Sequence, residues 1–319
     1  MPLIDLPFEQ LLRYEGRNPK PADFDRYWDA GLEEMRGIDP EVELTPHPLN
    51  SRLAECFHLR FTGVGGARVY AKYLRPRHVV KPGPAVLLFH GYSGHSGDWQ
   101  DKLALVSQGY AVAALDCRGQ GGLSEDVGGV QGPTLRGHII RGLIDGPEKL
   151  YYRSVFLDTA QLANIVMGFP EVDFTRVAAA GGSQGGGLTL ACAALEPRIV
   201  RAAPTFPFLC DYRRVWEMDL AKGAYEELST FLRQFDPLHA RADLWWERLG
   251  YIDCQHLAPR IRAKVLMPVG LMDTICPPST QFAAYNKIVS EKDLLVYPDY
   301  GHEGLPGASD LIFDFLADL

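Results

Sequence analysis

The stretch that decides the fold is Arg176-Val-Ala-Ala-Ala-Gly-Gly-Ser-Gln-Gly-Gly-Gly-Leu-Thr-Leu190. A short apolar run leads into Gly181-Gly182-Ser183-Gln184-Gly185, which fits the pattern G-x-S-x-G, and a helical pattern follows. In this strand–turn–helix context the serine lies on a strained turn that pushes its hydroxyl outward. Side chains two residues to either side would collide there, and glycines at 181 and 185 avoid the collision. The stretch therefore predicts Ser183 as a nucleophile at a helix N-terminus, where the helix dipole favours a developing anion.

A glycine-rich turn can also bind phosphate or simply join a strand to a helix. Nucleotide-binding turns of this kind carry G-x-x-x-x-G-K-[ST] or G-x-G-x-x-G, and this sequence contains neither pattern. The nucleophile interpretation is therefore preferred.

The rest of the chain alternates between short apolar runs and helical patterns, which is typical of an α/β fold with a mostly parallel sheet and helices on both faces. The predicted strands are 85–89, 111–115, 176–180, 202–206, 265–270 and 294–297, and the predicted helices are 100–108, 154–168, 185–195, 279–289 and 309–319.

Two segments extend this pattern. Residues 1–80 are predicted to form an N-terminal helix over 23–35, after an irregular start, and an antiparallel edge hairpin from 53–62 and 68–74. Residues 208–260 are helix-like, contain three of the five tryptophans, and are predicted to form a helical cap over the carboxyl ends of the strands. We expect residues 1–319 to form a single domain.

Composition and charge exclude several classes of protein. The chain has 319 residues, 46% of them hydrophobic and 23% charged, which excludes disorder for most of its length. A net charge of −8 argues against nucleic acid or an anionic membrane as the main partner. No apolar stretch approaches the roughly 20 residues of a membrane helix, and residues 1–5 lack the features of a signal peptide. Six cysteines without metal-like spacing predict reduced thiols and a cytoplasmic location.

A serine nucleophile needs a base to take its proton. In this kind of fold the order along the chain is serine, acid, histidine. His302 lies in a loop after the last predicted strand, whereas His239 and His256 fall in the insertion, so His302 is the predicted base. Asp273 follows the penultimate strand and is the predicted acid that orients the imidazole. Asp299 is the weaker candidate because it shares the turn of His302.

A loop after an early strand supplies one oxyanion-hole donor in such folds, and the residue after the nucleophile supplies the other. The backbone N–H groups of Tyr92, in Phe89-His90-Gly91-Tyr92, and of Gln184 are the predicted donors. Arg118, beside a glycine-rich turn after the strand 111–115, is predicted to be a hydrogen-bonded structural brace.

Three segments together resemble the signature of carbohydrate esterase family 7, the acetyl xylan esterases and cephalosporin C deacetylases of the α/β-hydrolase superfamily. They are Arg118-Gly119-Gln120, Gly181-Gly182-Ser183-Gln184-Gly185 and His302-Glu303, and the likeness extends over nearly the whole chain. The resemblance implies an α/β-hydrolase fold, a Ser183–His302–Asp273 triad, and a site braced by Arg118 and Gln120. Residues 121–126 do not match the family pattern, which leaves the preference for the alcohol undefined.

The same resemblance implies a homohexamer that uses no cofactor and no metal. It also implies an intracellular serine carboxylesterase that deacetylates small substrates such as acetylated xylo-oligosaccharides and cephalosporin C through an acetyl-enzyme. A serine peptidase or amidase of the same fold is the alternative. A non-catalytic α/β-hydrolase is disfavoured because all three triad candidates are present.

Overall fold

The computed structural model describes residues 4–78, 81–127, 137–317 and 319. Within these ranges no helix has both the length and the apolar character needed to cross a bilayer. The six cysteines all lie in the described ranges, where they are buried and free of disulfides.

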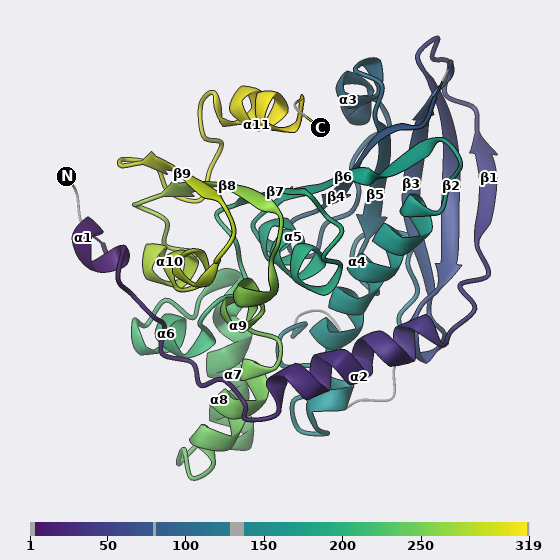
Figure 1. The fold of residues 1–319 in the computed structure, drawn as a ribbon. Helices are drawn as coiled ribbons and strands as arrows, with labels where there is room; N and C mark the ends of the chain where they lie inside the picture. Colours follow the sequence, from purple (N-terminus) through teal and green to yellow (C-terminus); the bar gives the residue numbers. More distant parts are fainter. Residues whose placement is uncertain (1–3, 79–80, 128–136, 318) are drawn as a thin grey trace.

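Nine strands of the described chain form one sheet in the order β1-β2-β3-β5-β4-β6-β7-β8-β9 (Figure 1). Strands β1, β2, β3 and β5 pair antiparallel, and β5, β4, β6, β7, β8 and β9 pair parallel. The bounds are β1 Glu43–His47, β2 Ala54–Thr62, β3 Arg68–Pro76, β4 Gly83–Phe89, β5 Ala111–Asp116, β6 Val172–Gly182, β7 Arg201–Thr205, β8 Lys264–Gly270 and β9 Lys292–Tyr297.

Helices cover both faces of this sheet. Helices α3 and α11 lie on one face, and α2, α4, α5, α9 and α10 lie on the other (Figure 1). The bounds are α1 Phe8–Leu11, α2 Phe24–Arg36, α3 Leu103–Ser107, α4 Tyr151–Met167, α5 Gln184–Leu195, α6 Tyr212–Glu217, α7 Glu226–Phe235, α8 Ala242–Gly250, α9 Cys254–Leu257, α10 Pro278–Lys287 and α11 Ala308–Ala317.

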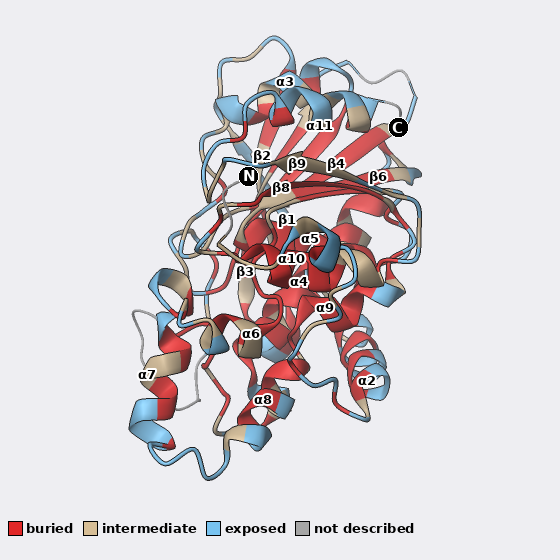
Figure 2. Cartoon of the chain, turned by 90° about the vertical axis from the view of Figure 1, so that its left-hand side faces the viewer, coloured by how far each residue is buried: buried red, intermediate tan, exposed pale blue. Residues whose placement is uncertain are grey.

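Burial explains this layering. Every residue of β5 is buried, and Figure 2 shows a buried sheet between helices whose outer faces are exposed. A strand covered on both faces must be apolar on both faces, which is why its sequence does not alternate. Helix α5 is buried along its whole length because it lies between the sheet and neighbouring helices. The predicted α/β class with a mostly parallel sheet is confirmed.

The structure differs from the sequence prediction at three elements. Residues 1–20 contain the short helix α1, and the hairpin carries an additional edge strand, β1. Strand β1 is exposed at four of its five residues, so its sequence lacks the apolar pattern that reveals a strand. The helix predicted over 100–108 is a 3-10 turn, Gln100–Lys102, followed by the single-turn helix α3.

The N-terminal helix α2 packs as its pattern predicts, with Phe24, Trp28 and Met35 on its buried face. The indole N–H of Trp28 donates to the carbonyl of Tyr251, 2.9 Å away, and its ring stacks on Phe156 of α4. Because these contacts satisfy the polar edge of a large ring and bury its faces, they hold α2 against both α4 and the segment between β7 and β8.

The chain between β7 and β8 forms helices α6, α7, α8 and α9. Helices α6, α7 and α8 lie at the lower left in Figure 1. The buried aromatic residues of these helices and of the turns beside them join the core on the α5 side of the sheet: Phe208, Tyr212, Tyr225, Phe231, Trp245 and Trp246.

Candidate active site

Ser183 lies in a strained turn between β6, which ends at Gly182, and α5, which begins at Gln184. Its φ and ψ are 58° and −120°, a backbone conformation that residues other than glycine rarely adopt. Its N–H donates to the carbonyl of Thr205 at 3.0 Å, and its carbonyl accepts from the N–H of Phe208 at 2.9 Å. These bonds to the end of β7 and the loop after it hold the turn in place.

The two glycines of the motif allow the turn to approach β4 closely. A Cβ on Gly181 would lie 2.6 Å from the carbonyl oxygen of Phe89, and a Cβ on Gly185 would lie 2.1 Å from it. Both contacts are with backbone, which has no side-chain freedom to relieve them. The steric reason given for glycine at these positions is therefore what the structure shows.

Asp273, His302 and Ser183 form one hydrogen-bonded chain at the carboxyl ends of the parallel strands. His302 Nδ1 lies 2.8 Å from Asp273 Oδ2, and His302 Nε2 lies 2.9 Å from Ser183 Oγ. The Asp273 carboxylate is fully buried, and its Oδ1 accepts the backbone N–H groups of Ile275 and Cys276, each at 2.8 Å. A carboxylate accepts only, so Nδ1 carries the imidazole proton and Nε2 is free to accept from the serine.

The other residues considered as acid or base lie elsewhere. His302 bonds to Asp273, as preferred, and no described contact joins it to Asp299. His239 packs against Trp216, and His256 Nε2 lies 3.2 Å from the carbonyl of Asn18. Burial lowers the pKa of His256 to about 3.

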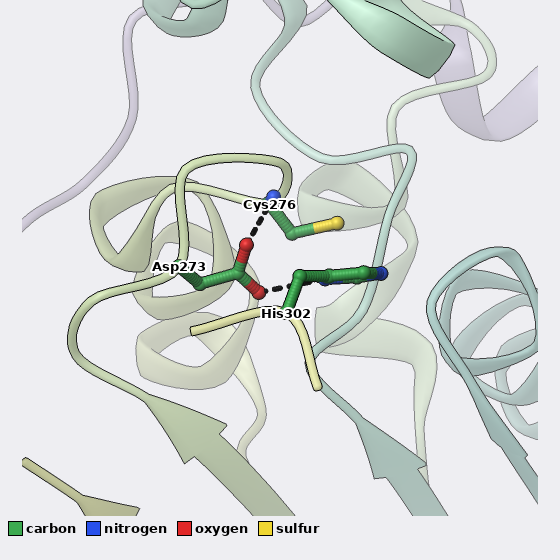
Figure 3. A group of neighbouring side chains, drawn as sticks. All are labelled: Asp273, Cys276 and His302. Carbon is green, nitrogen blue, oxygen red and sulfur yellow. Dashed lines mark hydrogen bonds and ion pairs between the residues drawn. The ribbon is translucent and has the colours of Figure 1, made fainter. Parts of the chain in front are cut away.

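Cys276 lies beside Asp273 and His302 (Figure 3). One ligand atom from each of the three residues lies within 4.8 Å of the others, which makes them the one metal-like group among the described residues. The donor set fits a metal poorly, because Asp273 and His302 already bond to each other and burial raises the pKa of the Cys276 thiol. A metal would require the thiolate.

Tyr92 and Gln184, the predicted oxyanion donors, lie in segments that one side chain joins. The Gln120 Oε1 accepts the N–H of Ser93 at 2.9 Å, and its Nε2 donates to Gln184 Oε1 at 2.9 Å. Gln184 opens α5, so its backbone N–H has no acceptor within the helix. Gln120 thus ties the loop after β4 to the start of α5.

Arg118 lies beneath this network in a buried ion pair with Asp158 of α4. Its Nε and one terminal nitrogen donate to the two carboxylate oxygens at 2.5 and 2.6 Å, and the other donates to the carbonyl of Val64 at 2.7 Å. Both side chains are at most 2% exposed. A bidentate pair with a third hydrogen bond satisfies the guanidinium where water cannot, so Arg118 braces the loop that carries Gln120.

Several residues of the site carried no sequence signal. Tyr151 and Tyr152 open α4: the Tyr151 hydroxyl donates to the carbonyl of Arg118, and the Tyr152 hydroxyl donates to Gln184 Oε1. Glu227 of α7 accepts the hydroxyl proton of Tyr92 at 2.6 Å. Burial raises the pKa of Glu227 to about 7 against the opposing effect of that hydrogen bond. No spacing rule links residue 92 to residue 227, because their contact is purely tertiary.

This fold, with a serine at a strand–helix turn bonded to a histidine and an aspartate after later strands, defines an α/β-hydrolase. Residues 1–319 match the acetyl xylan esterase (AXE1) family over their whole length, and the chain belongs to that family. The sequence prediction of this family is confirmed, and it places the chain among the carboxylic ester hydrolases.

Two solved structures and one further protein of known name are similar to this chain. Acetyl xylan esterase 1 from Thermoanaerobacterium sp. JW/SL YS485 is 56% identical with a TM-score of 0.97, over 98% of this chain and 99% of that one. The acetyl xylan esterase from Paenibacillus sp. R4 is 35% identical with a TM-score of 0.93, again over 98% and 99%. The acetyl esterase Axe7A of Xylanibacter ruminicola is 24% identical over 299 residues, which are 92% of this chain and 65% of that protein.

The close approach at Gly185 yields a first prediction. Gly185→Ala forces a methyl group against the Phe89 carbonyl, so we expect a loss of at least about 2 kcal/mol of stability and of nearly all esterase activity. Urea unfolding and hydrolysis of p-nitrophenyl acetate measure the two effects. Gly37→Ala is the matched control, because its Cβ would make only ordinary contacts at 3.5 Å. A Gly185→Ala protein with the stability of the wild type would refute the steric argument.

The buried ion pair yields a second prediction. Asp158→Asn leaves the Arg118 guanidinium buried without its counter-charge, which we expect to lower the free energy of unfolding by about 3–5 kcal/mol. Arg26→Ala removes a pair whose side chains are 82% and 41% exposed, and it should change stability by less than about 1 kcal/mol. Equal effects of the two substitutions in urea unfolding would contradict the assignment of Arg118 as a brace.

Proposed function

We propose that the protein is a serine carboxylesterase that removes acetyl groups from small acetylated substrates. The observation that carries the proposal is the continuous chain from Asp273 through His302 to Ser183, with links of 2.8 and 2.9 Å. Membership of the acetyl xylan esterase family supports acetyl as the acyl group.

The reaction begins when Ser183 Oγ attacks the acetyl carbonyl carbon while its proton passes to His302 Nε2. The carbonyl oxygen becomes an oxyanion, which the backbone N–H groups of Tyr92 and Gln184 stabilise. When the C–O bond to the alcohol breaks, His302 gives the proton to the departing alcohol oxygen, and the acetyl group remains on the serine.

A water molecule completes the cycle. His302 Nε2 takes a proton from the water, whose oxygen attacks the acetyl-enzyme and forms a second oxyanion. Collapse of this intermediate returns that proton from His302 to Ser183 Oγ and releases acetic acid, which ionises to acetate. Throughout both steps Asp273 accepts from Nδ1–H, which keeps the imidazole in the reactive tautomer and stabilises the imidazolium. The residues of the described site supply every proton transfer, and the proposal requires no metal and no cofactor.

The finer parts of the proposal rest on the family resemblance. We propose acetylated xylo-oligosaccharides and acetyl esters like that of cephalosporin C as substrates, and a homohexamer as the assembly. Six buried, unpaired thiols support a reducing, cytoplasmic location. We also propose one domain in which residues 208–260 form the cap, because α7 of this segment reaches the loop that carries Tyr92.

A serine peptidase or amidase is the alternative, because the same three residues serve both reactions. The matched family favours the ester. Parallel assays with p-nitrophenyl acetate and an acetyl p-nitroanilide separate the two, since they share the acyl group and differ only in the leaving atom.

The third prediction tests the nucleophile and the acyl preference together. Ser183→Ala should lower kcat by about 10⁴-fold or more, as removal of a triad serine does, and should abolish labelling by a fluorophosphonate. The native protein should hydrolyse p-nitrophenyl acetate faster than the butyrate and the octanoate. Ser107→Ala removes an exposed hydroxyl in α3 and serves as the control.

The outcomes separate chemistry from specificity. Full activity of Ser183→Ala would place the nucleophile elsewhere and reject the proposal. Preference for octanoate would leave the serine chemistry in place and reject the acetyl specificity.

A further inference from the structure

Tyr92 of the loop after β4 has a side chain that reaches across to α7, the helix of the segment between β7 and β8. Its hydroxyl donates to Glu227 Oε1 at 2.6 Å. The second carboxylate oxygen, Oε2, accepts the backbone N–H of Ile140 at 3.0 Å. One carboxyl group therefore joins three segments that lie far apart in the sequence.

Two aromatic rings contact the ring of Tyr92, in addition to the hydrogen bond of its hydroxyl. His138 lies against it with ring centroids 4.8 Å apart, and Phe208 meets it edge to face at 5.6 Å. On the neighbouring residue, the N–H of Ser93 donates to Gln120 and its Oγ lies 3.3 Å from His138 Nε2. The backbone of Tyr92 is thus fixed through its own side chain on one side and through Ser93 on the other.

Glu227 is a costly residue to bury. Only 6% of its surface is exposed, and desolvation is the largest influence on its pKa, which it raises to about 7. Tyr152 of α4 also lies nearby, and it is a neutral phenol whose pKa burial raises far above the usual value. Among the described residues no ion pair offsets the cost of burying the Glu227 carboxyl group, so the hydrogen bonds that it accepts from Tyr92 and Ile140 must offset it. An apolar side chain at position 227 would avoid this cost but would leave the Tyr92 hydroxyl and the Ile140 N–H without an acceptor.

We propose that Glu227 is a positioning residue for the oxyanion hole: through the Tyr92 side chain it fixes the backbone N–H of Tyr92 at the distance from Ser183 that the transition state requires. The inference rests on the proposed esterase function and deepens it, because it assigns a part of the reaction to the cap. Glu227 touches no reacting atom and acts only through Tyr92.

The chemistry of the two contacts selects the test variants. Glu227→Gln keeps the size of the side chain but offers one acceptor oxygen to two donors, so either Tyr92 or Ile140 meets an N–H₂ group instead. Tyr92→Phe removes the same hydrogen bond from the other end and keeps the backbone N–H. Because both variants break one contact, the double variant should lose no more than the more severe single variant.

The experiment measures kcat and KM for p-nitrophenyl acetate in the wild type, the two single variants and the double variant. We expect kcat to fall about tenfold with KM within about twofold, since a full donor is worth about 10²–10³ and here it is displaced rather than removed. The inhibition constant of an acetyl-mimicking trifluoromethyl ketone, which forms a tetrahedral adduct with a serine, should rise by the same factor as kcat falls.

Glu226→Gln is the control, because it makes the same charge change at the adjacent, exposed position of α7. It should leave kcat, KM and the inhibition constant at the values of the wild type. If Glu227→Gln fails to fold, Tyr92→Phe still tests the same hydrogen bond.

Three results would overturn the inference. One is a wild-type kcat in both Glu227→Gln and Tyr92→Phe. Another is a rise in KM with unchanged kcat, which would assign Glu227 to substrate binding. The last is a double variant whose loss is the sum of the single losses, which would show two independent effects. A failure of the proposed function is seen separately in the wild type, which would then not bind the ketone, and it would remove the basis of the inference as well.

Discussion

The close approach of the Ser183 turn to the end of β4 is the constraint on which the rest of the site depends. A Cβ at Gly185 would lie 2.1 Å from the Phe89 carbonyl, so no residue with a Cβ fits between the two backbones without a shift of one of them. This contact sets the distance between the serine and the loop that follows Phe89, which carries Tyr92. If the turn moved away by the width of a methyl group, Ser183 Oγ and the proposed oxyanion donor of that loop would no longer face the same small acyl group.

A turn under this strain persists only when its surroundings over-determine it. Backbone bonds from Ser183 to Thr205 and Phe208 fix it to β7 and the loop beyond, and the Gln184 side chain bonds to Gln120 and Tyr152. Gln120 lies in the loop after β5, and the Arg118–Asp158 ion pair holds this loop against α4. The supports come from β7, α4 and the loop after β5, so loosening any one of them acts on the serine from a distance.

The sequence predicted the parts of this arrangement that short-range rules govern. Ser183 follows from a steric motif, and His302 and Asp273 follow from chain order and from the ends of apolar strands. The strand β1 was missed because four of its five residues are exposed and it pairs only at the sheet edge. Glu227, Tyr151 and Tyr152 were missed for a different reason. Each acts through a side-chain contact between segments 30 or more residues apart, and neither spacing nor hydropathy encodes such a contact.

Polar contacts also explain why the helical segment between β7 and β8 docks in one position. Apolar contacts are non-directional, so they specify the position of the segment less sharply than hydrogen bonds do. A buried carboxylate specifies it more sharply, because away from its donors it loses several kcal/mol. Asp211 accepts the N–H groups of Arg17 and Asn18 and the Tyr14 hydroxyl, and Glu227 accepts from Tyr92 and Ile140. A shift of the segment would break hydrogen bonds at both carboxylates. The loop that carries Tyr92 and the N-terminal residues Tyr14 to Asn18 are therefore both joined to this segment by hydrogen bonds to its buried carboxylates.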